Sequence, residues 1–136
     1  MAGYSGTPLA RKLGFKEGFR IRVANAPDNY LDLVSPVPES ATISQKIRKE
    51  IDIWHFFTSS ESELKTRLPK LMKAIHPDGI IWVSWPKKSS GVPSSVTEDT
   101  IRAAALPLGL VDVKVCAVDD TWSGLKLVIR KELRNA

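Results

Sequence analysis

Residues 51–85 read IDIWHFFTSSESELKTRLPKLMKAIHPDGIIWVSW, and they carry the clearest pattern of strands and a helix in the chain. Its first seven residues are apolar at nearly every position, which is typical of a strand buried on both faces of a parallel sheet. Ser60 and Glu63 then form the S-x-x-E pattern of a capping box, which predicts the start of a helix. A Pro-Asp-Gly turn leads into a second buried strand over residues 80–85. This order of elements predicts two parallel strands joined by a crossover helix.

The predicted helix between these strands has one apolar stripe at helical spacing. The stripe consists of Leu64, Leu68, Leu71, Met72 and Ile75. Pro69 lies inside the pattern, and a proline removes a backbone hydrogen bond, so we expect a kink there. The stripe stays in register across Pro69, which favours one helix over two.

The flanking segments extend the alternation of strands and helices. Short helices are predicted over residues 8–13 and 28–34, strands over 20–25 and 41–43, a polar linker over 45–50, a helix from Thr97, and an antiparallel hairpin over 111–129. We therefore expect a single-domain, three-layer α/β protein over residues 1–136, with a short N-terminal arm over residues 1–6. Its sheet should be open and mostly parallel, with an antiparallel hairpin at the C-terminus.

Composition narrows the functional classes. The chain has 136 residues, of which 43% are hydrophobic and 26% charged, as in a globular domain with its own core. No apolar run approaches the roughly 18 residues that span a bilayer, and no signal peptide precedes the first helix. The single cysteine, Cys116, cannot form an internal disulfide, so we expect a cytoplasmic protein. The chain has a net charge of +5, but its basic side chains are mostly interspersed with acids on predicted helix faces, which argues against nucleic-acid binding.

From Ile51 onward the sequence resembles the second half of a class I S-adenosylmethionine-dependent methyltransferase. The shared features are a buried strand led by Asp52, a helix, the turn at residues 77–79, a further helix and an antiparallel hairpin. The resemblance implies a Rossmann-like fold. Such enzymes carry a glycine-rich loop after their first strand, but residues 23–27 read VANAP, and no acidic residue follows the strand near residue 43. We therefore predict no cofactor.

Four motifs resemble the signatures of an uncharacterised bacterial family, the domain of unknown function DUF3052. They are GYSGTPL at residues 3–9, NAP at 25–27, WVSWPK at 82–87 and DDTWSGLK at 119–126. This resemblance implies no activity, cofactor or catalytic residue.

The predicted topology gives a place where a ligand would bind. Ligands of open α/β sheets lie outside the carboxyl ends of the strands, near the point where the strand order reverses. The segments expected there are Asn25, residues 58–59, residues 85–88 and the turn at 119–124.

The loop formed by Lys87, Lys88, Ser89 and Ser90 is the first candidate site. Its ammonium and hydroxyl groups suit a phosphate or carboxylate, although an ordinary solvated loop has the same composition. Trp85 and Trp122 flank this loop, either to stack on a planar ligand or to pack in the core.

Asn25 is a candidate hydrogen-bond donor to a ligand, but Asn-Ala-Pro is equally typical of a turn. The other polar residues favour structural roles. We expect His55 to be a buried core histidine, His76 to lie at a helix C-terminus, and Asp119 and Asp120 to belong to a turn or salt bridge. Neither histidine has further ligands at metal-binding spacing, so no metal site is predicted.

These residues favour a non-enzymatic binding or regulatory module over an enzyme, because no positioned acid, base or nucleophile is evident. Its partner would be an anionic small molecule or a protein that binds at the carboxyl edge of the sheet. Two alternatives stay open. One is a degenerate or atypical methyltransferase-like enzyme, and the other is a pure protein-interaction domain with an exposed apolar patch near Tyr4 and Trp122.

Overall fold

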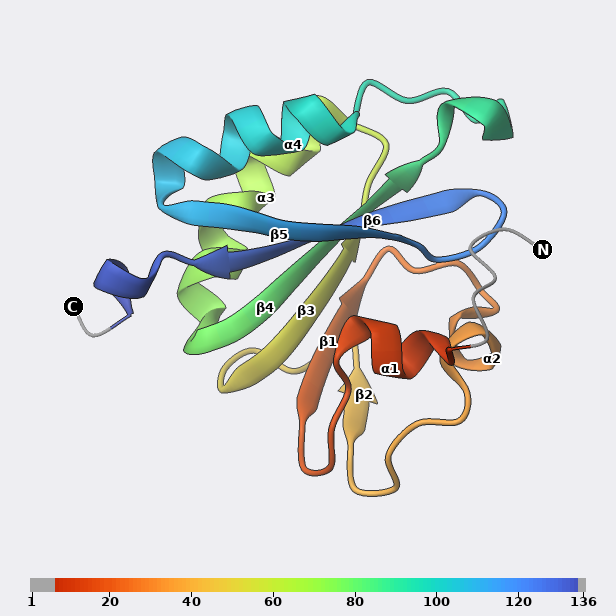
Figure 1. Ribbon diagram of the computed structural model, residues 1–136, viewed down its shortest axis with the longest axis vertical. Helices are drawn as coiled ribbons and strands as arrows, with labels where there is room; N and C mark the ends of the chain where they lie inside the picture. Colours follow the sequence, from red (N-terminus) through yellow and green to blue (C-terminus); the bar gives the residue numbers. More distant parts are fainter. Residues whose placement is uncertain (1–6, 135–136) are drawn as a thin grey trace.

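Six strands form one sheet in the order β2-β1-β3-β4-β6-β5 (Figure 1). This computed structural model describes residues 7–134, so the expected arm over residues 1–6 lies outside the described residues. The parallel strands are β1 (Arg20–Ala24), β2 (Thr42–Ser44), β3 (Ile51–Phe57) and β4 (Ile75–Pro86). The antiparallel hairpin consists of β5 (Leu110–Ala117) and β6 (Trp122–Ile129), and β6 pairs with β4. The expected fold class is confirmed.

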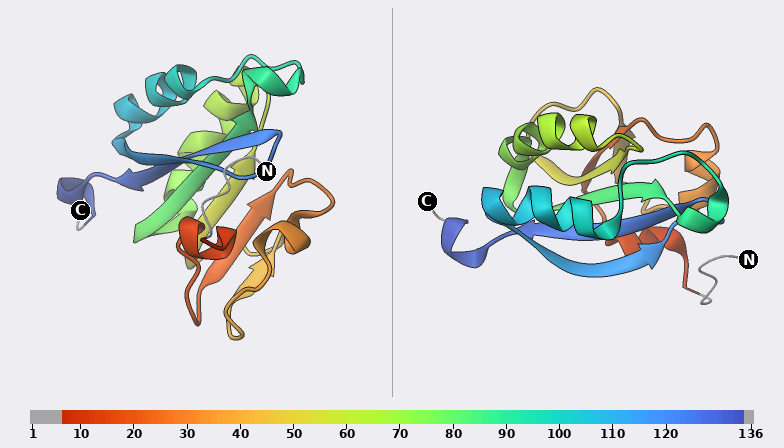
Figure 2. Two further views of the ribbon diagram at one scale, coloured as in Figure 1. Left: turned by 45° about the vertical axis from the view of Figure 1, so that its right-hand side comes forward. Right: turned by 90° about the horizontal axis from the view of Figure 1, so that it is seen from above.

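Two helices pack on each face of the sheet (Figures 1 and 2). The helices α1 (Leu9–Leu13) and α2 (Tyr30–Val34) cover one face, and α3 (Glu61–Ala74) and α4 (Glu98–Ala105) cover the other. Short 3₁₀ turns follow β4, α4 and β6, over Lys88–Ser90, Leu106–Leu108 and Lys131–Leu133. Within residues 7–134, no helix is both long and apolar enough to cross a membrane.

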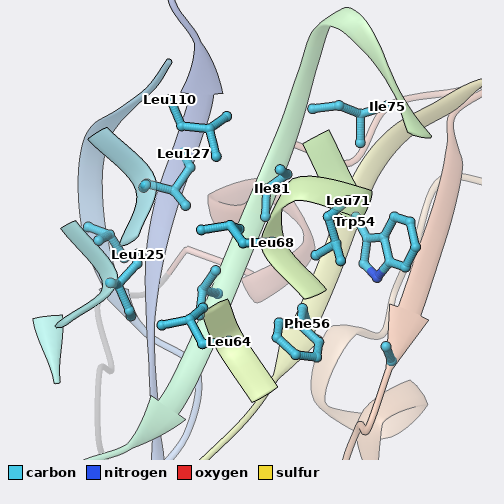
Figure 3. Close-up of a cluster of buried hydrophobic side chains, with 14 of the residues drawn as sticks. Trp54, Phe56, Leu64, Leu68, Leu71, Ile75, Ile81, Leu110, Leu125 and Leu127 are labelled. Carbon is cyan, nitrogen blue, oxygen red and sulfur yellow. The ribbon is translucent and has the colours of Figure 1, made fainter. Parts of the chain in front are cut away.

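The core beneath α3 follows the predicted stripe (Figure 3). Leu64, Leu68 and Leu71 are completely buried against the strands. Pro69 lies within the helix without ending it. Because the buried leucines precede and follow Pro69 on one face, packing on the sheet offsets the hydrogen bond that the proline removes.

The strand β4 begins earlier than the sequence predicts. Ile75 has extended backbone angles and pairs with Ile51, after which the register shifts. His76 therefore lies in β4 rather than at a helix C-terminus, and its Nε2 is 3.8 Å from a carboxylate oxygen of Asp52. The Pro-Asp-Gly turn thus lies inside one long, irregular strand.

The hairpin strand β5 departs from regular alternation. A register shift between Asp112 and Lys114 leaves Val113 53% exposed. The strand β5 lies at one edge of the sheet, where an ion pair between Arg102 and Asp112, at 2.8 Å, holds it to α4.

Candidate functional site

The four segments expected at the carboxyl edge of the sheet do meet there. The strands β1, β3 and β4 are parallel, and β6 starts at the same edge because it runs antiparallel to β4. The amide of Lys87 donates to the carbonyl of Thr121 at 2.7 Å, and the amide of Ser95 donates to the carbonyl of Ser59 at 3.0 Å. The loops of this edge are therefore joined to one another.

Asn25 makes the turn at the end of β1 and ties it to the neighbouring strand. Its φ of 59° is left-handed, a conformation that asparagine tolerates better than most residues. The side-chain amide donates to the carbonyl of Phe57 at 3.1 Å and to the Glu63 carboxylate at 3.3 Å. The other oxygen of that carboxylate accepts a hydrogen bond from Thr58 Oγ1 at 2.6 Å.

These bonds link the carboxyl ends of β1 and β3, between which the strand order reverses. They also change the expected capping box. Ser60 Oγ accepts from the amide of Glu63, as predicted, but the Glu63 side chain turns to Asn25 and Thr58 instead of the amide of Ser60. Thr58 Oγ1 accepts from that amide in its place, at 3.1 Å.

A hollow of about 640 Å³ lies at the carboxyl ends of β1 and β2. Its lining combines apolar walls with hydrogen-bonding groups. The lining residues are Val23, Asn25, Ala26, Pro27, Asp28, Tyr30, Leu31, Ile43, Ser44, Gln45 and Lys46. Among the candidate residues of the sequence, Asn25 lines this hollow.

The chemistry of the hollow is asymmetric. Ser44 ends β2 and Gln45 and Lys46 follow it, and these residues offer a hydroxyl, an amide and an ammonium group. Asp28, in the loop after β1, offers the opposite charge. A ligand with an apolar or planar part and an anionic end suits this arrangement, since the donors gather on the β2 side.

Tyr30 connects the hollow to a fully buried polar chain. Its hydroxyl lies 2.8 Å from Nδ1 of His55, and Nε2 of His55 lies 2.7 Å from Oγ of Ser84. Burial lowers the pKa of His55 to about 3 and raises the pKa of Tyr30, so both groups are neutral near pH 7. The prediction of a buried, hydrogen-bonded His55 is confirmed.

The loop after β4 forms a 3₁₀ turn over Lys88–Ser90. Ser90 Oγ donates to the carbonyl of Lys87 at 2.6 Å and accepts from the amide of Val92 at 3.2 Å. Its hydroxyl therefore stabilises the loop, whereas Lys88 and Ser89 are exposed. An anion site at these lysines stays a prediction.

Trp85 and Trp122 lie on opposite faces of the sheet. Trp85 belongs to the core beneath α3 and α4, while Trp122 packs beside α1 and α2 with its ring 5.1 Å from that of Phe57. The two rings therefore do not form a slot for one planar ligand.

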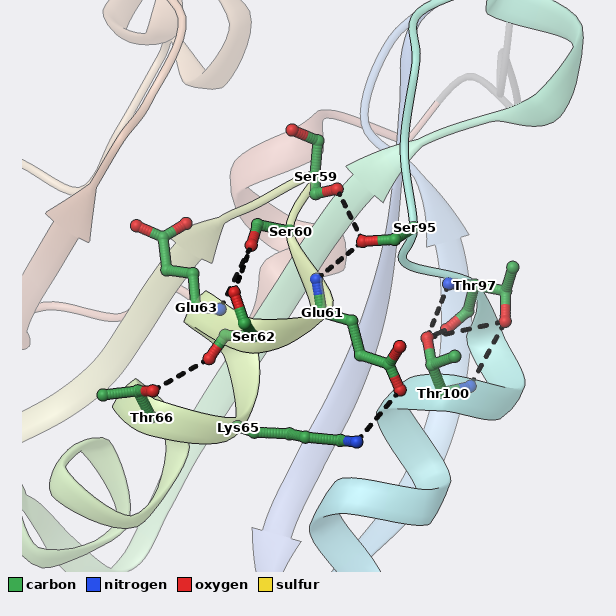
Figure 4. A network of polar contacts seen from close by, with 10 residues as sticks. All are labelled: Ser59, Ser60, Glu61, Ser62, Glu63, Lys65, Thr66, Ser95, Thr97 and Thr100. Carbon is green, nitrogen blue, oxygen red and sulfur yellow. Dashed lines mark hydrogen bonds and ion pairs between the residues drawn. The ribbon is translucent and has the colours of Figure 1, made fainter.

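The N-terminus of α3 is occupied by groups of the protein itself (Figure 4). Ser95, from the loop before α4, accepts a hydrogen bond from the amide of Glu61 at 2.8 Å, and Ser60 Oγ accepts from the amide of Glu63. These two amide groups are thus unavailable to an anion.

The remaining polar candidates have structural roles. The Asp119 carboxylate accepts from the amides of Thr121 and Trp122 at 2.8 and 2.7 Å, which forms the expected turn. Burial raises the pKa of the Cys116 thiol, so it is a weak nucleophile. Between residues 7 and 134, no three His, Cys, Asp or Glu side chains are grouped so as to hold a metal ion.

Sequence reasoning missed most of the hollow. The signals were present at the predicted ends of the first two strands, in Asp28 and in the Ser44-Gln45-Lys46 run. These signals were not recognised because β2 is only weakly predicted: its three residues are too few to show a periodicity. Its position beside β1 is known only from the strand order of the sheet.

Several solved structures that share this fold are described as methyltransferases. A SAM-dependent methyltransferase from Aquifex aeolicus superposes with a TM-score of 0.68, at 13% identity, over 89% of this chain and 88% of that chain. A putative type 11 methyltransferase from Sulfolobus solfataricus gives 0.64, at 12% identity, over 90% of each chain. A ribosomal protein L11 methylase from Lactobacillus delbrueckii subsp. bulgaricus gives 0.59, at 9% identity, over 89% of this chain and 74% of that one. Identities this low show the shared fold alone.

The residues of this chain do not provide the usual cradle for S-adenosylmethionine. After β1, the side chains of Ala26 and Pro27 line the hollow where a glycine-rich loop would leave bare backbone, and Pro27 has no N–H to donate. The strand β2 ends in Ser44 rather than a carboxylate. No methyl-transfer step follows from this geometry.

No curated protein matches the sequence. A family model described as a protein of unknown function, DUF3052, matches residues 37–131. Since these residues are more than half of the chain, the protein belongs to the DUF3052 family.

Proposed function

We propose that this protein is a binding module for a small molecule with an anionic group, held in the hollow at the carboxyl ends of β1 and β2. The hollow itself carries the proposal, because its volume of about 640 Å³ lies in the range of small-molecule sites. Its position is where open α/β sheets bind ligands. The donors of Ser44, Gln45 and Lys46 would hold the anionic group, and Val23, Leu31 and Ile43 would contact the apolar part.

The absence of evident catalytic groups in the hollow supports binding over catalysis. Asp28 is the acidic residue of the lining, and the neutral His55 lies behind Tyr30, fully buried. Asn25 has its amide engaged by Phe57 and Glu63. A general acid and base would have to converge on one bound substrate, and the hollow's lining offers one carboxylate.

An S-adenosyl compound, bound by an atypical methyltransferase-like enzyme, is the second candidate. The left-handed turn at Asn25 stands where a glycine turn would, and Asp28 brings a carboxylate to the hollow beside it. Because Ala26 and Pro27 line the same hollow, such a ligand would have to lie farther from the backbone than in a glycine-rich loop.

A thermal-shift screen of the purified protein tests the proposal. The panel contains sugar phosphates, nucleotides, small carboxylates, S-adenosylmethionine and S-adenosylhomocysteine. A ligand at 100 times its dissociation constant adds about 2.7 kcal/mol, which raises the melting temperature of a domain of this size by several degrees. A shift with S-adenosyl compounds alone would replace the first proposal by the second.

The variants Lys46→Ala and Lys49→Ala form a matched pair. Both lysines are exposed in the linker between β2 and β3, but only Lys46 lines the hollow. Loss of an ionic hydrogen bond should weaken an anionic ligand about tenfold in Lys46→Ala, while Lys49→Ala should bind as the wild type does. Equal affinity in both variants would refute the proposed site, and no shift with any compound of the panel would favour a protein partner.

A further inference from the structure

Three arginines gather on the face of the sheet that α3 covers, away from the hollow. Arg22 extends from β1, Arg48 lies in the linker before β3, and Arg67 lies on α3. The Arg22 guanidinium stacks on the Trp54 ring at 4.7 Å, and the Arg67 guanidinium lies 5.4 Å from the Phe56 ring centre. Burial, followed by the positive charges of Arg67 and Arg48, lowers the pKa of Arg22, so each of these two charges lies within electrostatic range of the Arg22 guanidinium.

The stacked pair at the centre of this cluster has unsatisfied hydrogen-bond donors. Arg22 Nη1 donates to the carbonyl of Ile47, but Nε of the same guanidinium is buried without a partner. The indole Nε1 of Trp54 is also buried without a partner, and its ring is only 6% exposed. Buried N–H groups are nearly always hydrogen-bonded, so two orphaned donors in one stacked pair indicate an absent acceptor.

The charge of the three arginines has no ion-pair partner in the part of the chain that the structure describes. Throughout residues 7–134, no carboxylate forms an ion pair with any of the three arginines. The nearby acid Glu63 is instead hydrogen-bonded to Thr58 and Asn25. Three converging cations with no counter-charge destabilise the fold, unless an anion lies among them.

We propose that the cluster of Arg22, Arg48 and Arg67 is a binding site for a phosphate group carried by a small molecule. Guanidinium groups bind phosphate through paired N–H donors, and β1, the linker before β3 and α3 each contribute one such group on this face of the sheet. The aromatic rings of Trp54 and Phe56 hold two of the three side chains in position before the anion arrives. The site is independent of the hollow, because it lies on the other face of β1 and uses different residues.

Titration with inorganic phosphate, followed by NMR of the tryptophan indole N–H signals, tests the proposal. Ionic strength is kept constant with chloride. The Trp54 indole signal should shift saturably, because its N–H lies in the stacked pair. The indole of Trp82 donates to the carbonyl of Leu13 at 2.9 Å on the opposite side of the sheet, so its signal should stay unchanged and serves as an internal reference.

Two variants remove single arginines without touching the stacked pair. Arg48→Ala and Arg67→Ala should each weaken phosphate binding about tenfold, since each loses charge-assisted hydrogen bonds. The controls Lys49→Ala and Lys70→Ala remove exposed cations from the same linker and the same helix, and should bind phosphate as the wild type does.

Three results would overturn the proposal. The first is a Trp54 signal that does not shift, or that shifts equally with chloride. The second is equal weakening in the arginine variants and the lysine controls, which would indicate general charge attraction. The third is a single-stranded oligonucleotide that binds far more tightly than phosphate and loses affinity in both arginine variants, which would assign the site to nucleic acid. Since none of these variants lines the hollow, the outcome is separate from that of the proposed function.

Discussion

Acidification should destabilise this protein well above the pH at which its carboxylates titrate, because of His55. The imidazole is fully buried between Tyr30 and Ser84, and burial lowers its pKa to about 3 from the ordinary 6.5. Below pH 6.5 the unfolded chain therefore binds a proton that the folded protein excludes. The contribution of the neutral His55 to the free energy of unfolding is fully present above pH 6.5, and it is lost as the pH drops towards 3.

The two pKa values set the size of this effect. At pH 5, which is about 1.5 units below the pKa of an unfolded histidine, protonation stabilises the unfolded chain by about 1.36 kcal/mol for each of these units. The free energy of unfolding should thus be about 2 kcal/mol lower at pH 5 than at pH 8. The carboxylates of Glu17 and Asp112, whose pKa values are lowered by hydrogen bonds from Ser40 and Arg102, add their own loss only at more acidic pH.

Urea denaturation at half-unit pH steps between 5 and 8 measures the effect. His76→Gln removes the other imidazole of the chain and should keep the slope, whereas His55→Gln should abolish it. If His55→Gln does not fold, NMR of the wild-type imidazole nitrogens replaces it and should show a neutral ring down to pH 4.5. A flat stability between pH 8 and 5, or a His55 ring that titrates near pH 6, would refute the reasoning.

Three further substitutions have defined outcomes. Leu68→Ala should lower the free energy of unfolding by about 2–5 kcal/mol in urea, because Leu68 is completely buried beneath α3; a loss below about 1 kcal/mol would contradict that packing. Gly124→Ala should cost about 1–3 kcal/mol in the same assay, because its Cβ would lie 3.2 Å from the buried ring of Trp82; an unchanged midpoint would show that the two strands separate easily there. The double substitution of Lys87 and Lys88 by alanine should leave the melting temperature nearly unchanged while weakening any anion bound at that loop, and a collapse of the melting temperature would show that the two lysines are structural.

The elements that sequence alone predicts are those with strong local signals. The strand β3 has the predicted bounds, since five of its seven residues are apolar and such a run is typical of a strand buried on both faces. The helix α3 begins at the predicted cap Ser60 and keeps its stripe through Pro69. In both cases local propensity and burial favour the same structure.

Contacts between distant parts of the chain explain where the structure differs from the prediction. Ile75 completes the apolar stripe of α3, yet it pairs with Ile51 and starts β4, because a strand partner was available there. Glu63 has the position of a capping-box residue, but its carboxylate accepts hydrogen bonds from Asn25 and Thr58 instead. Asn25 itself is 38 positions from Glu63, so no local pattern could indicate that bond.

The sequence predicted the edge of the sheet where ligands would bind, but it centred the candidate site on the loop of Lys87 to Ser90 rather than on the hollow. The carboxyl edge follows from the order of strands and helices, and Asn25 does line the hollow found there. The alternation of side chains put Trp85 and Trp122 on opposite faces of the sheet, which depends on the register of β4 with β6. Register across a sheet is set by the whole fold, and one sequence does not show it.

The most direct test of the central claim is to map a bound ligand by NMR chemical-shift changes of the backbone amides. Any compound that stabilises the protein in the thermal-shift screen serves as the probe. The largest changes should fall on Asn25, Ser44, Gln45 and Lys46, at the carboxyl ends of β1 and β2. Changes confined to Ser89 and Ser90, with these four amides unaffected, would place the ligand at the loop after β4 and refute binding in the hollow.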